Sequence, residues 1–136
     1  MKFPNSLVYL TQNTFVFNNE GKFLTLLRTE SAPSRALTWD LPGGAYEKPE
    51  DPKESARREI HEEARITVKE INPLTVEKKI GSQGDLWITI VYQTNAIDTE
   101  VTLSSEHGAY KWVTPSEFLK LETSEQWKRI VKENLL

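Results

Sequence analysis

Three glutamates, Glu59, Glu62 and Glu63, stand close together in the segment RREIHEEAR, which covers residues 57–65. Side chains three and four positions apart are neighbours on an α-helix, so these carboxylates would repel one another by roughly a few tenths of a kcal/mol per pair. A hard divalent cation such as Mg²⁺ or Mn²⁺ prefers oxygen ligands and would turn that repulsion into coordination. The competing interpretation is a solvated, ion-paired helix face, because Arg58 can pair with Glu62 one turn later. This segment by itself leaves both interpretations open.

The residues just before the glutamates form a strong helix start. Asp51 offers an N-cap, Pro52 suits the first helical position, and Glu54 places an acid in the first turn. β-branched residues with strand-like alternation begin after Arg65, so we expect the helix to run over about residues 52–65.

One face of this helix is apolar. Ala56, Ile60 and Ala64 recur every fourth residue and predict a stripe that faces the core. The glutamates occupy the adjoining face, and the basic side chains fall largely on the other side; these are Arg57, Arg58, His61 and Arg65. This separation of charge favours a cation-binding face, and it leaves His61 as a structural or exposed residue.

The segment from Gly44 to Ile66, GAYEKPEDPKESARREIHEEARI, resembles the Nudix box, in which glycine, glutamate, an Arg-Glu pair and a Glu-Glu pair recur at fixed spacings. The positions in register are Gly44, Glu50, Arg58, Glu59, Ile60, Glu62, Glu63 and Ile66. Arg65 departs from the pattern, because the family has glycine there. A glycine would serve a left-handed helix exit, a conformation that costs another residue about 1–2 kcal/mol.

The resemblance implies a metal site. Glu59, Glu62 and Glu63 would hold Mg²⁺ or Mn²⁺, and a backbone carbonyl of Gly43 or Gly44 would add an oxygen ligand. Nudix enzymes hydrolyse a nucleoside diphosphate linked to another moiety, by attack of water on a phosphorus of the pyrophosphate. The metal would neutralise charge, activate water and align the attack.

The resemblance also implies roles for the residues around the metal. Arg58 would orient a box glutamate, and Glu50 would support the adjoining loop rather than bind the cation. Glu59 is a candidate general base, as in MutT-like members of the family. The residues expected to act in catalysis are Glu59, Glu62 and Arg58.

Further candidates lie outside the box. Glu106 stands six residues before Trp112, where MutT-like proteins have a metal-binding glutamate, although a glutamate in a polar loop is as often simply solvated. His107 could approach a phosphate, but we expect it to be exposed. Arg28 and Arg35 could contact phosphates or be solvated.

The remaining sequence predicts a mixed fold of strands and helices. Strands are expected at 6–17 and 22–28 as a hairpin, at 66–80 and 86–94 as a second hairpin around GSQG with the latter strand largely buried, and at 109–113, whereas residues 29–38 form a loop. Helices are expected to begin at residue 114 and to cover 124–136. With the resemblance, this order predicts an α/β fold: a Nudix-type α/β/α sandwich with a mixed sheet, forming one domain over residues 1–136.

Aromatic residues are expected mainly in the core. Trp39, Trp87 and Trp112 could stack on a base, but core packing is the better expectation for most of them. The last predicted helix carries an apolar stripe that should pack on the core: Trp127, Ile130, Val131 and Leu135.

Composition restricts the possible partners. A net charge of −3 argues against a nucleic acid polymer as partner, because phosphate-backbone binders carry a basic excess. There is no cysteine, and neither a signal-peptide h-region nor a membrane-spanning run is seen, so we expect a cytoplasmic protein without membrane contact. The family resemblance permits a monomer or a homodimer.

Two classes of function follow. The leading hypothesis is a metal-dependent pyrophosphohydrolase that acts on a nucleoside triphosphate or modified nucleotide; hydrolysis of ADP-ribose or another nucleotide sugar is an alternative. Branches acting on ADP-ribose or dinucleoside polyphosphates show a proline or tyrosine shortly after the box, and this chain has no proline from 74 to 114 and no tyrosine from 66 to 91. The competing class is a non-catalytic Nudix-fold module that binds a nucleotide or a protein, for which losses among the box carboxylates are expected. None is lost.

Overall fold

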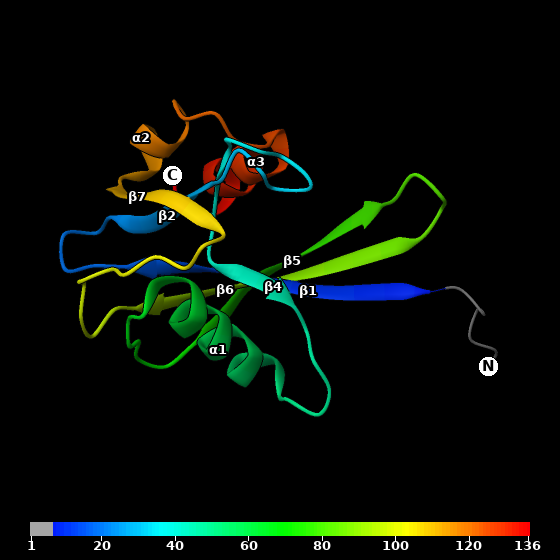
Figure 1. Ribbon diagram of the computed structural model, residues 1–136, viewed down its shortest axis with the longest axis horizontal. Helices are drawn as coiled ribbons and strands as arrows, with labels where there is room; N and C mark the ends of the chain where they lie inside the picture. The colour runs from blue at the N-terminus through cyan, green and yellow to red at the C-terminus, as the bar shows by residue number, and fades with distance from the viewer. Residues whose placement is uncertain (1–6) are drawn as a thin grey trace.

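A mixed seven-stranded sheet lies between two helical layers (Figure 1). The computed structural model describes residues 7–136, so Ser6 of the first expected strand and most of the N-terminal segment judged for a signal peptide lie outside the described residues. Helix α1 (Pro52–Ala64) covers one face of the sheet, and α2 (Pro115–Phe118) and α3 (Glu125–Asn134) cover the other. The predicted sandwich with a mixed sheet is therefore confirmed.

The long central strand of the sheet is β1 (Val8–Phe17). It runs parallel to β6 (Leu86–Asn95) over its whole length, and β5 (Asn72–Ile80) pairs antiparallel to β6 at the sheet edge. On the other side β1 is followed by β2 (Phe23–Arg28) and then the short β3 (Trp39–Asp40). Two further strands pair off this path, β4 (Gly43–Ala45) with β1 and β7 (His107–Val113) with β2.

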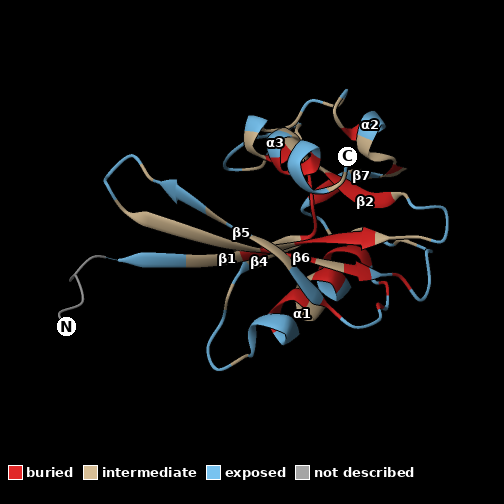
Figure 2. Ribbon diagram, turned by 180° about the vertical axis from the view of Figure 1, so that it is seen from behind, coloured by how far each residue is buried: buried red, intermediate tan, exposed pale blue. Residues whose placement is uncertain are grey.

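The core is divided by the sheet into two clusters. Ala56, Ile60 and Ala64 of α1 are fully buried in the first cluster, as the helical periodicity predicts. In the second, the α3 stripe packs through Trp127, Ile130 and Val131, with Leu135 partly buried beside them. Figure 2 shows buried ribbon concentrated in the part of the sheet that lies between the helices and on the helix faces that meet it.

Both expected hairpins are present, but their extents differ from the prediction. β1 and β2 pair only at Phe17 and Phe23, because β4 then takes the edge of β1. The second hairpin closes at the GSQG turn as predicted. Its first strand begins at Asn72, so the prediction that this strand starts at residue 66 is wrong. In that segment only Val68 makes a ladder contact, an isolated bridge to Ala96. The apolar alternation there reflects burial of Ile66, Val68 and Ile71 in the α1 core rather than strand pairing.

The β5–β6 hairpin and the start of β1 extend beyond the helical layers (Figures 1 and 2). Residues Leu86–Ile90 are therefore only half-buried, and the expectation of a largely buried strand holds only from Val91 onward. Among the described residues, no helix has the length and apolar character needed to span a membrane.

Both ends of α1 bear on the site. Asp51 occupies the N-cap position, but its side chain makes no capping hydrogen bond. At the other end Arg65 adopts the left-handed conformation, with φ 57° and ψ 28°, and its N–H donates to the His61 carbonyl at 2.9 Å. The helix exit thus keeps the geometry that suits glycine, even though arginine stands there.

Candidate active site

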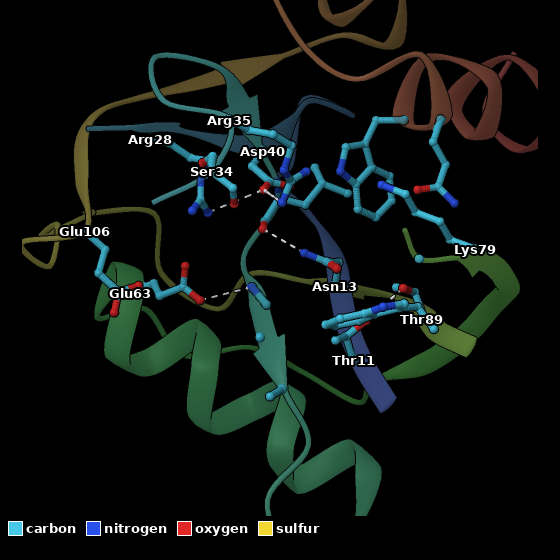
Figure 3. Close-up of a pocket in the computed structure, with 18 of the residues that line it drawn as sticks. Thr11, Asn13, Arg28, Ser34, Arg35, Asp40, Glu63, Lys79, Thr89 and Glu106 are labelled. Carbon is cyan, nitrogen blue, oxygen red and sulfur yellow. Dashed lines mark hydrogen bonds and ion pairs between the residues drawn. The ribbon is translucent and has the colours of Figure 1, made fainter. Parts of the chain in front are cut away.

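Glu63 lies in the last turn of α1 and points beneath β4 (Figure 3). Its Oε1 accepts a hydrogen bond from the Gly43 N–H at 3.1 Å, and the residue is only 4% exposed. Burial, reinforced by the neighbouring carboxyl of Glu59, raises the pKa of Glu63 to about 9, against the partial relief given by the Gly43 N–H. Without a cation, this carboxyl therefore holds a proton at neutral pH.

Glu59 lies one turn earlier, against the second glycine of the LPGG segment. A Cβ added to Gly44 would stand 2.7 Å from Glu59 Oε1, so the absence of a side chain there makes room for the carboxylate. Burial raises the pKa of Glu59 as well, and Arg58 opposes that rise. Two neighbouring carboxyl groups with raised pKa values, packed against the glycines of β4, form an oxygen-rich position where a divalent cation could replace a proton.

Arg58 ties the acidic residues together. Its Nε and Nη2 donate to the two carboxylate oxygens of Glu50 at 2.7 and 3.1 Å, and its Nη1 reaches both Glu59 and Glu62 at 3.1 Å. The Arg58 guanidinium lowers the pKa of Glu50. The expected separation of basic from acidic side chains is therefore wrong for Arg58, whose long side chain crosses to the glutamates, while His61 remains exposed as expected.

Glu62 is the outermost of the three box glutamates. Its side chain is 55% exposed and pairs with Arg58. It does not line the cavity described next, whereas Glu63 does. The structure thus places Glu59 and Glu63 against Gly44 and Gly43 and leaves the Glu62 side chain exposed to solvent.

A cavity of about 710 Å³ lies beside Glu63, between the sheet, α3 and the loop after β2. Glu63 and Glu106 lie at one end of it, and Asn13, Thr11 and Thr89 lie along the strands that form its floor (Figure 3). Lys79, from the end of β5, lies at the opposite side. The cavity is large enough for a nucleotide-sized ligand.

Glu106 and His107, at the start of β7, lie close to Glu63. Ligand atoms of Glu63, Glu106 and His107 all lie within 4.8 Å of one another. His107 is 7% exposed, so the expectation that it is exposed is wrong; it pairs with Arg28 at the start of β7, inside the sheet rather than in the loop. Burial lowers the pKa of His107, which keeps the imidazole neutral at pH 7. Glu106 is exposed, as the polar loop predicts.

Arg28 and Arg35 both line the cavity and share one buried carboxylate, Asp40. Asp40 Oδ2 lies 3.2 Å from Arg35 and 3.8 Å from Arg28, and its Oδ1 accepts the Leu41 N–H at 2.8 Å. Two guanidinium groups share one carboxylate, so this side of the cavity carries a net positive charge.

The loop that follows β2 has a strained backbone. Arg35 and Leu37 in this loop have positive φ values of 51° and 58°, which non-glycine residues rarely adopt.

Sequence reasoning did not identify several cavity residues. Asp40 was visible in WDLPG, but its link to two arginines depends on β2–β3 pairing. Thr11 and Asn13 of β1 and Thr89 of β6 also line the cavity. In the sequence they are simply polar residues within apolar strands, so nothing marked them as cavity residues. Trp127 packs in the core as expected and also lines the cavity.

Trp39, Trp87 and Trp112 are all only half-buried. The expectation of core packing holds for Trp112 alone. Trp112 packs against the α1 cluster. Trp87 instead stacks on Tyr9 at 4.5 Å between ring centroids and lines the cavity, and Trp39 lies under the Lys111 ammonium.

The donor set fits a hard divalent cation. Glu63 provides a buried carboxylate, Glu59 a half-buried one and Glu106 an exposed one, and the backbone of Gly43 and Gly44 lies against the first two. Oxygen donors of this kind suit Mg²⁺ or Mn²⁺, which also accept phosphate oxygens of a substrate.

Comparison with known proteins identifies the family. The sequence profile of the NUDIX domain matches residues 10–135. A MutT-like protein from Streptomyces ambofaciens is 32% identical over 102 residues, which are 75% of this chain and span about 61% of that relative's length. Among solved structures, the MutT protein from Methanosarcina mazei Go1 superposes with a TM-score of 0.82 at 25% identity, covering 96% of this chain and 95% of the other. A MutT NUDIX hydrolase from Burkholderia pseudomallei gives 0.80 at 25% identity, covering 96% of this chain and 100% of the other. With the box glutamates and the cavity placed as described, the chain belongs to the Nudix family.

Proposed function

We propose that this protein is a Mg²⁺- or Mn²⁺-dependent pyrophosphohydrolase that cleaves a nucleoside triphosphate or a modified nucleotide. The observation that carries the proposal is that Glu63 meets Gly43 at one end of a nucleotide-sized cavity, with Glu59 packed against the neighbouring Gly44. Family membership and the similarity to MutT-like proteins support the reaction class.

In this proposal the residues of the box divide the work. Glu59, Glu63 and Glu106 hold the cation, together with a carbonyl of Gly43 or Gly44. Glu62, which is more exposed, contacts the cation through a water molecule or binds a second cation. The bound cation supplies charge neutralisation on the phosphates and a more acidic water. Arg58, fixed by Glu50, holds the Glu59 and Glu62 carboxylates in position.

The chain also supplies a proton acceptor and a positive wall. Water attacks one phosphorus, the bond from that phosphorus to the bridging oxygen breaks, and the proton of the water passes to a box carboxylate. Glu59 is our candidate for this base, because its carboxylate lies beside Glu63 and is held in position by Arg58. Arg28 and Arg35 lie across the cavity, where their shared net charge would attract the phosphate chain.

The cavity beyond the phosphates is suited to a flat polar group. Trp87 offers an aromatic surface, and Asn13 and the hydrogen-bonded pair Thr11–Thr89 offer polar contacts on the strand floor. A nucleobase matches this combination.

A substrate panel tests the proposal. Purified protein is incubated with the common and oxidised nucleoside triphosphates, ADP-ribose and a nucleotide sugar, each with Mg²⁺, with Mn²⁺ and with EDTA. We expect metal-dependent release of a nucleoside monophosphate and pyrophosphate from at least one triphosphate. Turnover of ADP-ribose alone would move the substrate to the nucleotide-sugar class, and binding without any turnover would favour a non-catalytic module.

A further inference from the structure

A buried imidazole nitrogen without a hydrogen-bond partner faces Glu63. The side chain of His107 is 4% exposed, and its Nδ1 makes no hydrogen bond. Leaving such an atom unpaired in a protein interior is unfavourable. Glu63 Oε2 lies 3.6 Å from this nitrogen, which is too long for a hydrogen bond. The two atoms are nevertheless close enough to bind one cation together.

The fold holds this arrangement from two sides. His107 is fixed by its pairing with Arg28 at the start of β7, where the ladder is irregular between Leu27 and Arg28. Glu63 comes from α1, and its Oε1 is occupied by the Gly43 N–H. Its other oxygen is therefore the one turned toward the imidazole, and Glu106 completes a cluster within 4.8 Å.

We propose that His107 Nδ1 is a nitrogen ligand of the divalent cation held by Glu63 and Glu106, so that the site favours cations that accept imidazole, such as Mn²⁺ or Co²⁺, over Mg²⁺. This inference rests on the proposed metal-dependent function. Imidazole suits transition-metal ions, which Mg²⁺ with its preference for oxygen does not match. A site of oxygen ligands alone would give no reason for an unpaired nitrogen at this position.

Pulsed electron paramagnetic resonance of bound Mn²⁺ tests the inference directly. The chain has two histidines, and the other one, His61, is exposed on α1. Untagged protein loaded with Mn²⁺ should show the ¹⁴N modulation of a coordinated imidazole. The modulation should persist in His61→Gln and disappear in His107→Gln. Its absence from the wild-type protein, or its loss in His61→Gln alone, would overturn the assignment.

Calorimetric titration gives a second readout that does not depend on turnover. His107→Gln should weaken Mn²⁺ binding about tenfold and Mg²⁺ binding less than about threefold, whereas His61→Gln should change neither. Equal losses for both cations would contradict nitrogen ligation. Should His107→Gln fail to fold, the modulation in His61→Gln still assigns the nitrogen. Failure of the wild type to bind either cation would instead reject the proposed function, whereas Mn²⁺ binding and turnover without ¹⁴N modulation would reject only this inference.

Discussion

The Arg58 guanidinium donates hydrogen bonds to both carboxylate oxygens of Glu50, from Nε at 2.7 Å and from Nη2 at 3.1 Å. Its third nitrogen, Nη1, therefore points toward Glu59 and Glu62. Only arginine has the fork of donors that this arrangement needs. Arg58 thus connects the loop before α1 to the box glutamates.

Replacing Arg58 by lysine should lower kcat/KM by about 10- to 100-fold, because a single ammonium cannot bind Glu50 at two points and hold Glu59 as well. Steady-state kinetics at saturating Mg²⁺ measures the effect. Arg57→Lys is the matched control, since Arg57 donates only to the backbone carbonyls of Val68 and Lys69. Equal losses in both variants would contradict the role given to Arg58.

Gly44→Ala should reduce turnover strongly while the protein still folds. The added Cβ would lie 2.7 Å from Glu59 Oε1, which forces the carboxylate away from the glycine backbone. Kinetics together with circular dichroism measures both effects. In Gly108→Ala the new methyl group meets no atom within 4 Å, so this variant should keep its activity. An active Gly44→Ala enzyme would show that Glu59 does not need its present position.

The metal-free protein should become less stable as the pH rises from about 7 to 9. The pKa of Glu63 is raised from 4.5 to about 9 in the folded state, so the folded chain binds more protons than the unfolded chain in this range, and deprotonation favours unfolding. His107, whose pKa is lowered, acts in the opposite direction only near and below its ordinary value of 6.5, which lies outside the window. Thermal melts in EDTA at pH 7, 8 and 9 measure the trend.

Glu63→Gln serves as the control for that pH dependence, because it removes the titrating group and keeps the shape of the side chain. Its melting temperature should vary less over the same range. Adding Mg²⁺ to the wild type should raise the melting temperature more at pH 9 than at pH 7, since the cation competes with the proton. A wild-type melting temperature that stays constant from pH 7 to 9 in EDTA would contradict the buried, protonated state of Glu63.

Arg65→Gly should raise the free energy of unfolding by about 1 kcal/mol, because Arg65 holds φ at 57° and glycine adopts this conformation without strain. Chemical denaturation measures the change. Metal-dependent hydrolysis should persist, since Arg65 lies after the three glutamates and the helix exit already has the geometry that suits glycine. A folded Arg65→Gly variant without activity would contradict this explanation of the departure from the box.

Local signals in the sequence predicted α1 well. Pro52 and Glu54 marked its start, and the spacing of Ala56, Ile60 and Ala64 gave its buried face, because these features depend on helix geometry alone. The register of the box grouped Glu59, Glu62 and Glu63 without distinguishing them, whereas the structure places Glu59 and Glu63 against Gly44 and Gly43 and leaves Glu62 exposed.

Features that depend on strand pairing could not be predicted in this way. His107 looked like a loop residue, and only its register with Arg28 shows why it is buried. The same applies to Asp40, which meets Arg28 and Arg35 because β3 lies beside β2. The parallel pairing of β1 with β6 joins Thr11 to Thr89, two residues with no local signal that connects them.

In the proposed reaction, Glu59 and Glu63 hold the cation on which pyrophosphate release depends. The most direct measurement compares the wild type with Glu59→Gln and Glu63→Gln on a cleaved nucleoside triphosphate, with Mg²⁺ and with EDTA, by following nucleoside monophosphate and pyrophosphate together. We predict that the two products form in equal amounts in the wild type only with Mg²⁺, and that each variant loses at least about 100-fold in kcat while remaining folded. Unchanged turnover in either folded variant, or equal turnover in EDTA, would contradict the claim.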